Sequence, residues 1–356
     1  MLREEGNSVI DFVVVAYLFI PAFVVTRDYW NAFSISEKVL ISFIALSSAP
    51  MLFALERGNL VIFSLLFLPL LFTRFPYVTL AALAMLVNLK PYFALLFLVY
   101  VIKRRWNMLA VALGMAGGLY LLTSVILDSD LLALPRNLIG FSQKALFSYR
   151  EVLAMPSSVS ALSYVLESGT FKTGRSFGLA WLPVDPALIG ASLEAMKWSV
   201  QAWIVVALAR VGKALPTDVI LAVILVMTTN LGISVGGYTL IFYLPLIPIL
   251  SRMRFGYVYL SIVALISLPL DLWPLVQDNL PSRWMYSYFV GTKVPVELTI
   301  GLGSLARPLL NLLLLAVMAW EFTVARSKSV GAAVYGTMYD CPSLTNGIKD
   351  DTIYAK

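Results

Sequence analysis

The sequence contains no histidine and only one cysteine among its 356 residues. Without histidine, imidazole acid–base chemistry is excluded, and so are most transition-metal sites. The single cysteine, Cys341, cannot form a disulfide within the chain. Neither a histidine-dependent enzyme nor a disulfide-stabilised fold is therefore predicted.

Charge is also scarce, because only 13% of the residues are charged whereas 60% are hydrophobic, and the mean hydropathy is +0.86. This composition excludes a soluble globular domain and predicts a polytopic membrane protein that has the lipid bilayer as a partner. Residues 1–12 carry mixed charge and the apolar run behind them has no small-residue cleavage site, so no cleavable signal peptide is predicted. The net charge of +6 is typical of cytoplasmic loops that face anionic lipid, and no nucleic-acid partner is expected.

Long apolar runs make up most of the chain. A helix needs ~20 residues to cross ~30 Å of hydrocarbon, so some of these runs are full spans and others are too short. We expect an all-α fold with about 10–11 transmembrane or re-entrant helices. The runs are 10–26, 39–55, 60–73, 76–89, 91–102, 107–127, 198–212, 217–235, 238–250, 257–273 and 298–320.

Basic clusters at the ends of these runs predict the orientation, because lysine and arginine in short loops prefer the cytoplasm. The four clusters are at 103–106, 209–213, 251–254 and 325–329. All four clusters fall on the cytoplasmic side of the membrane if loops 128–197 and 274–297 are both outside. We therefore predict a multi-pass domain over residues 1–323 in the inner (plasma) membrane and a cytoplasmic polar tail over 324–356.

The predicted outer loop 128–197 is long, and proline, glycine and serine are scattered among its aromatic residues. Such loops are usually functional or disordered. Its apolar pieces "ALSYVL" and "FGLAWLPVDPALIGASL" indicate short interfacial or re-entrant helices that could cover a site.

Two polar stretches should lie together on the outer side. Run 91–102 enters the cytoplasm at the 103–106 cluster, so Lys90 at its other end and the stretch "ERGN" at 56–59 are both outside. The runs between them have only 12 to 14 residues, about 20 Å as helix, which is too short for a comfortable span. Short, proline-interrupted membrane segments are where substrate sites occur.

Lys90 is flanked on both sides by apolar sequence, and a lone lysine in such a place is a functional candidate. Its ammonium is a natural point-charge partner for phosphate. Two interpretations of the earlier stretch stay open. Glu56 and Arg57 could be an ion pair that marks the membrane boundary, or Arg57 and Asn59 could present donors to an anionic group at a helix N-terminus.

"FALERGNLVIFSLLFLPLLF", followed by "AALAMLVNLKPYFALLFLVYVIKRRW", resembles the RGN…K-x-x-P-type signature of the GT-C superfamily. These are polytopic glycosyltransferases that use polyprenyl-phosphate sugars. The stretch is most similar to the GT87 (DUF2029) family, which includes polyprenyl-phosphate-mannose-dependent mannosyltransferases. The resemblance covers residues 50–106 and continues weakly in "GISVGGYTLIFYLPLIPIL" and "ARPLLNLLLL", with "KPY" here where the family has K-x-Y-P. It implies a GT-C-like fold and a site for the donor phosphate at Lys90, with Glu56, Arg57 and Asn59 nearby.

Four other residues are weaker candidates. Asp128 and Asp130 follow a predicted span, where they are either solvated span-end residues or contacts for a sugar or a divalent metal; no metal ligand set or cofactor is otherwise indicated. Tyr238 follows a predicted glycine turn and could stack on a sugar. Arg307 opens the last run and either touches phosphate or caps the membrane edge.

These observations predict a membrane glycosyltransferase that moves a sugar from a polyprenyl-phosphate donor to an outer glycan or glycolipid acceptor. A carboxylate would remove the proton of the acceptor hydroxyl, and Lys90 with Arg57 would stabilise the charge on the leaving phosphate. Two alternatives stay open: a flippase or transporter of polyprenyl-linked lipid, and an O-antigen polymerase or ligase.

The carboxylate base is the least determined part of this prediction. Enzymes of the superfamily usually carry a catalytic aspartate in the first outer loop, between the first and second spans. The orientation predicted above makes run 10–26 an outside-to-inside span, so no outer loop follows it. We expect that the chain begins at the family's second span and that its activity depends on a second membrane subunit or an upstream extension. The alternative is that Asp11, or Glu4 and Glu5 just before it, supplies the carboxylate at the outer boundary. Asp11 is the only acid inside the first apolar run.

Overall fold

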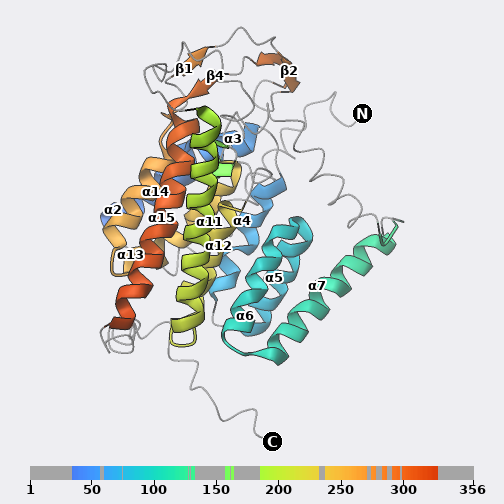
Figure 1. The fold of residues 1–356 in the computed structure, drawn as a ribbon. Helices are drawn as coiled ribbons and strands as arrows, with labels where there is room; N and C mark the ends of the chain where they lie inside the picture. Colours follow the sequence, from blue (N-terminus) through green and yellow to red (C-terminus); the bar gives the residue numbers. More distant parts are fainter. Residues whose placement is uncertain are drawn as a thin grey trace, which may run out of the picture.

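A computed structural model of the chain is mostly helical, with two small sheets at one end (Figure 1). It describes residues 34–56, 60–73, 75–126, 128, 130–132, 157–160, 162–163, 185–231, 237–270, 274–277, 283–286, 291–296 and 299–327. The predicted run 10–26 and most of the tail lie outside these residues.

The helical elements follow the predicted runs closely through the first half of the chain. They are α2 (Ile35–Ser47), α3 (Ala49–Glu56), η1 (Leu60–Phe63), α4 (Ser64–Phe67), η2 (Pro69–Phe72), α5 (Pro76–Leu89), η3 (Pro91–Phe97), α6 (Leu98–Ile102) and α7 (Trp106–Ile126). The second half holds α11 (Pro186–Val211), α12 (Thr217–Thr229), η5 (Gly237–Leu246), α13 (Ile247–Arg252), α14 (Gly256–Ser267) and α15 (Leu302–Ser327). Elements marked η are 3₁₀ helices.

Three helical segments of the described chain are long and apolar enough to cross a membrane: Ile35–Leu55, Trp106–Ile126 and Leu302–Val324. Between them lie shorter apolar segments, among them Pro76–Leu89 and Pro91–Ile102. A membrane-associated helical protein is therefore supported by the structure.

The short segment after Lys90 gains length by starting as a 3₁₀ helix. Seven residues of η3 at ~2.0 Å and five of α6 at ~1.5 Å per residue give about 22 Å. This is longer than an α-helix of the same residues, but it is still shorter than a hydrocarbon core of ~30 Å. A 3₁₀ run of this length is uncommon and often marks a functional region.

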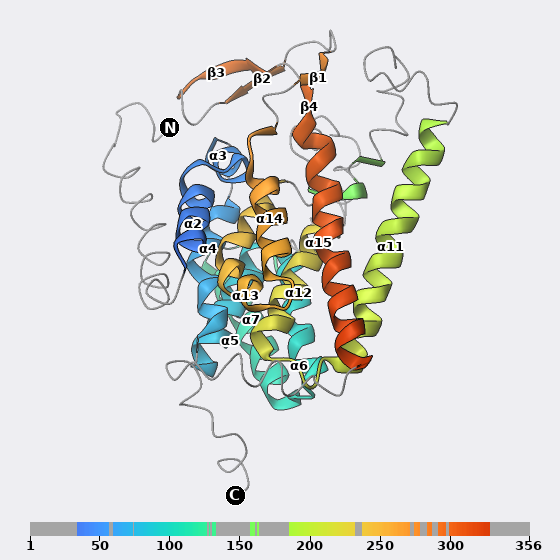
Figure 2. The same cartoon turned by 90° about the vertical axis from the view of Figure 1, so that its left-hand side faces the viewer.

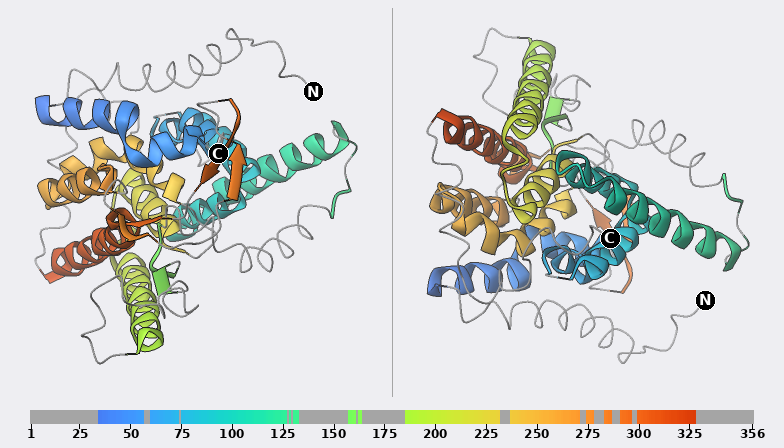
Figure 3. Two further views of the ribbon diagram at one scale, coloured as in Figure 1. Left: turned by 90° about the horizontal axis from the view of Figure 1, so that it is seen from above. Right: turned by 90° about the horizontal axis from the view of Figure 1, so that it is seen from below.

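The centre of the bundle is α12. Its residues 219–226 are buried on every side, as expected of a helix that is apolar all round. It packs against η3, α6, η5, α13 and α15, and Figure 2 shows it inside the bundle, beside α13 and α15. By contrast α7 packs mainly on α5 and leans away from the rest of the bundle, as Figure 3 shows from both ends.

The basic clusters gather at one end of the bundle. The Lys103 ammonium donates to the carbonyls of Lys213 and Leu215, the first at 3.0 Å. The carboxylate of Asp218 lies within electrostatic range of both Lys103 and Arg252. Lys90 directly precedes η3, so it lies at the opposite end of the η3–α6 segment from Lys103.

Four boundaries of the sequence prediction were wrong. Residues 186–197, predicted as loop, are the first half of α11, because Lys197 forms an ion pair with Glu194 at 2.7 Å and its charge is thereby neutralised within the helix. The last helix begins at Leu302 instead of residue 298 and continues to Ser327, past the predicted start of the tail at 324. The helix predicted to end at 273 ends at Ser267, two residues before Pro269.

Strands in the predicted outer loop 274–297 and just after it were not foreseen by the all-α prediction. Strand β1 (Pro274–Gln277) pairs antiparallel with β4 (Thr299–Gly301), and β2 (Arg283–Tyr286) pairs with β3 (Lys293–Val296). They lie beyond the end of the bundle where α15 begins (Figure 1). Pairing between β1 and β4, more than twenty residues apart, leaves no periodic signal in a short sequence window.

Candidate functional site

Lys90 occupies the break between two short helices. Its backbone is extended, with φ −147° and ψ 119°, and it serves both as the C-cap of α5 and as the N-cap of η3. The break follows from Pro91, which disfavours a helical conformation at the residue before it. The Lys90 side chain is half-buried. Burial lowers the pKa of its ammonium. The residue lies between the two apolar helices and belongs to neither.

An apolar groove begins beside Lys90 and follows η3 and α6. Its volume is about 410 Å³, and its lining comprises Pro91, Tyr92, Ala94, Leu95, Phe97, Leu98, Val101 and Leu231. Leu98 and Val101 are exposed on the outside of the bundle, so the groove is open on the face that would meet lipid. Lys90 directly precedes Pro91, the first lining residue in the chain, and an isoprenoid chain would fit the apolar lining chemically.

Two buried polar atoms near this groove have no hydrogen-bond partner within the described chain: the Tyr92 hydroxyl and the Asn230 side-chain carbonyl oxygen. Tyr92 lines the groove, and Asn230 directly precedes another lining residue, Leu231. A buried unpaired polar atom costs about 1–3 kcal/mol. Such a cost in an unliganded protein is compensated when a ligand supplies the missing partner.

A buried polar network lies directly behind Asn230, and sequence reasoning missed it. The Tyr243 hydroxyl donates to Asn311 Oδ1, the Thr229 hydroxyl donates to the same oxygen at 3.1 Å, and Asn311 Nδ2 donates to the Ser157 carbonyl at 2.8 Å. The signal was present in the sequence, because asparagine and threonine inside apolar runs are expensive in a membrane and therefore candidates for function.

Part of the predicted outer loop packs between α11 and α15. In the described residues 157–160 and 162–163, every side chain is buried. Lys197 donates to the Ser160 hydroxyl, and the Ser163 hydroxyl donates to the Gly190 carbonyl at 3.0 Å. Of these residues, Leu162 and Ser163 belong to the piece "ALSYVL", whose predicted role as a cover over a site stays a prediction.

Tyr238 lies at the same end of the bundle as Lys90. Its ring stacks on Phe53, with centroids 6.5 Å apart and planes 11° apart, and it is within electrostatic range of Tyr92. Phe53 is one turn before Glu56, the last residue of α3. The structure thus brings the end of α3, Tyr238 and the Lys90 break to one region, whereas Arg57, Asn59 and Asp11 lie outside the described residues.

Arg307 is fully buried in α15, and its guanidinium donates hydrogen bonds to backbone carbonyls of the protein. Its Nε donates to the Ile266 carbonyl at 3.0 Å and its Nη2 to the Leu268 carbonyl at 2.8 Å. These carbonyls end α14 and lack helical partners. The guanidinium therefore caps α14, which accounts for its burial without a substrate.

Asp128 and Asp130 lie apart from the groove. Asp128 follows the C-terminus of α7 with a positive φ of 47°, and Asp130 accepts a hydrogen bond from the Leu132 amide at 2.9 Å. Both are exposed at the tip of the helix that leans away from the bundle (Figure 3). In the part of the chain that the structure describes, no group of three or more acidic or cysteine residues could hold a metal ion.

No family model, no curated protein and no solved structure matches the chain. The resemblance to the polyprenyl-phosphate glycosyltransferases is therefore carried by the sequence motif alone, and the geometry described above is independent of it.

Proposed function

We propose that this chain is an integral membrane glycosyltransferase of the GT-C type, which takes a sugar from a polyprenyl-phosphate donor in the inner (plasma) membrane. The observation that carries the proposal is the arrangement at the α5–η3 break, where a half-buried lysine directly precedes the first residue that lines an apolar groove. The charge suits the donor phosphate and the groove suits the isoprenoid chain. The acceptor is a glycan or glycolipid on the outer face.

The proposed reaction is a single displacement at the anomeric carbon. The acceptor oxygen forms the new bond to that carbon, the bond from carbon to the phosphate oxygen breaks, and the hydroxyl proton passes to a carboxylate. Lys90 stabilises the negative charge that accumulates on the leaving polyprenyl phosphate. The Tyr92 hydroxyl donates to a phosphate oxygen and Asn230 Oδ1 accepts from a sugar hydroxyl. Asp11 is the proposed base.

A flippase is the second candidate, because a groove open to the bilayer and a broken helix also suit movement of an intact lipid. Purified chain in liposomes, given polyprenyl phosphate labelled in its sugar and no nucleotide sugar, separates the two. Label transferred to an acceptor supports the glycosyltransferase. Label that reaches the opposite leaflet still attached to polyprenyl phosphate, without transfer, would replace it with the flippase.

The location of the site predicts a topology. A cysteine at Asp130 or Gln277 should react with an impermeant maleimide added to intact cells, whereas native Cys341 should react only after the cells are opened, since the basic end is expected in the cytoplasm. Labelling of Cys341 in intact cells would invert the orientation.

The unpaired Tyr92 hydroxyl predicts opposite effects on stability and binding. Tyr92→Phe removes a buried group with no partner, so the free energy of unfolding should stay the same or rise by up to about 1 kcal/mol. The KM for the donor should rise about tenfold, because a hydrogen bond to phosphate is lost.

Tyr243→Phe is the matched control, since its hydroxyl is paired with Thr229 and Asn311. It should lower the free energy of unfolding by about 1 kcal/mol. Equal loss of stability in the two variants would show that Tyr92 is satisfied in the free protein and is not a ligand contact.

A further inference from the structure

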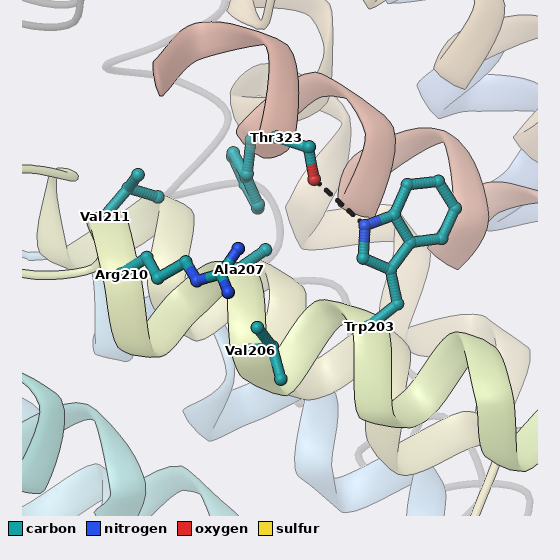
Figure 4. Close-up of a pocket in the computed structure, with 7 residues that line it drawn as sticks. Trp203, Val206, Ala207, Arg210, Val211 and Thr323 are labelled. Atoms are coloured by element: carbon teal, nitrogen blue, oxygen red, sulfur yellow. Dashed lines mark hydrogen bonds between the residues drawn. The ribbon is translucent and has the colours of Figure 1, made fainter. Parts of the chain in front are cut away.

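A second groove lies at the opposite end of the bundle from Lys90, between α11 and α15 (Figure 4). Its volume is about 310 Å³, and its lining comprises Trp203, Val206, Ala207, Arg210, Val211, Phe322 and Thr323. Arg210 is in the last turn of α11, directly before the loop whose carbonyls bind Lys103. The groove therefore opens at the basic end.

Arg210 has no acidic partner among the residues that the structure describes. Within the described chain its exposed guanidinium has neither an ion-pair nor a hydrogen-bond partner, although it lines the groove. In Figure 4 its side chain extends along α11 toward Ala207. The closest acid along α15, Glu321, accepts instead from the Arg254 amide at 3.1 Å and the Tyr259 hydroxyl at 2.6 Å.

The groove changes from charged to apolar along its length. Trp203 lies seven residues before Arg210 on α11, which is about 10 Å along the helix axis. Its indole nitrogen donates to the Thr323 hydroxyl at 2.9 Å, so the ring is held as a wall (Figure 4). Val206, Ala207 and Phe322 supply an apolar surface between the two. A free anion would use only the rim, whereas an amphipathic ligand would use the whole groove.

We infer that this groove binds an anionic phospholipid, with the headgroup phosphate on Arg210 and one acyl chain between α11 and α15 toward Trp203. Charge complementarity selects this occupant, because Lys103 and Arg252 also lie at this end of the bundle and basic pockets between membrane helices bind anionic headgroups. The inference rests on the membrane location proposed above and not on sugar transfer.

Native mass spectrometry of the delipidated full chain in detergent tests the inference, with phosphatidylglycerol and phosphatidylcholine as probes. We expect the first phosphatidylglycerol to bind about tenfold more tightly than phosphatidylcholine, which corresponds to about 1.4 kcal/mol. Arg210→Gln should abolish this preference. Lys213→Gln, which removes one exposed charge from the same end without touching the groove, should retain it.

Val206→Trp provides a second test, because it fills the groove and leaves Arg210 in place. It should weaken the first phosphatidylglycerol about tenfold, and it decides the matter if Arg210→Gln fails to fold. Equal affinity of the wild type for the two lipids, equal losses in Arg210→Gln and Lys213→Gln, or unchanged binding in folded Val206→Trp would each overturn the inference. Lipid binding is read directly as mass, so a failure of sugar transfer does not affect this result.

Discussion

Lys90→Ala is expected to lower kcat/KM for the polyprenyl-phosphate sugar about 100-fold or more, with normal expression and folding. The reason is that Lys90 supplies the positive charge at the α5–η3 break, and loss of one preorganised group that stabilises transition-state charge typically costs this much. Lys90→Arg should lose less, about tenfold, because a planar guanidinium keeps the charge but does not fit a site built for a compact ammonium. The measurement is steady-state transfer from labelled donor by purified variants.

Lys213→Ala is the control for this prediction, since it removes an exposed lysine at the opposite end of the bundle. Its kcat/KM should stay within about twofold of the wild type. Unchanged turnover in Lys90→Ala would remove the assignment of the donor phosphate to this break.

Arg307→Leu should produce the largest loss of stability. The side chain is fully buried and donates to the carbonyls of Ile266 and Leu268. Leucine would fill part of the volume, but the carbonyl of buried Ile266 would lose its donor, while the Leu268 carbonyl would still accept from the Leu270 amide at 2.8 Å. We expect the free energy of unfolding to fall by about 3 kcal/mol, which should appear as a lower Tm by about 5 °C or more in tryptophan-detected thermal unfolding.

Arg254→Leu serves as the comparison, because this arginine is exposed and its guanidinium lies 5.4 Å from the centre of the Phe255 ring. Its effect should be within about 0.5 kcal/mol. A folded Arg307→Leu variant of wild-type stability that has lost transfer would contradict the capping role and return Arg307 to the substrate site.

The helices around Lys90 could be predicted from the sequence because proline marks their boundaries. Pro76 and Pro91 each open a helix, and α5 and the η3–α6 segment have the predicted bounds. The parity of the basic clusters likewise predicted that they share one end, which the contact between Lys103 and the 213–215 loop confirms for two of them.

Other features depend on contacts that no local pattern contains. The charge of Lys197 indicated a loop. In the structure Glu194 neutralises the Lys197 ammonium, which also donates a hydrogen bond to the Ser160 hydroxyl, and the helix begins at Pro186. Arg307 was predicted either to touch phosphate or to cap the membrane edge, because only the folded chain reveals that α14 ends beside it. The Tyr92 hydroxyl became a candidate for the same reason, because a missing partner is visible only when all neighbours are known.

The central claim is that the groove next to Lys90 holds the isoprenoid chain of the donor, and photolabelling tests it most directly. Polyprenyl phosphate with a diazirine near its first isoprene unit would be bound to the purified chain, irradiated, and its sites mapped by peptide mass spectrometry. The account predicts labels on residues 91–101 and Leu231, which are displaced by unlabelled polyprenyl phosphate and reduced in Lys90→Ala. Labels confined to α7, or labels on the groove that unlabelled lipid fails to displace, would contradict it.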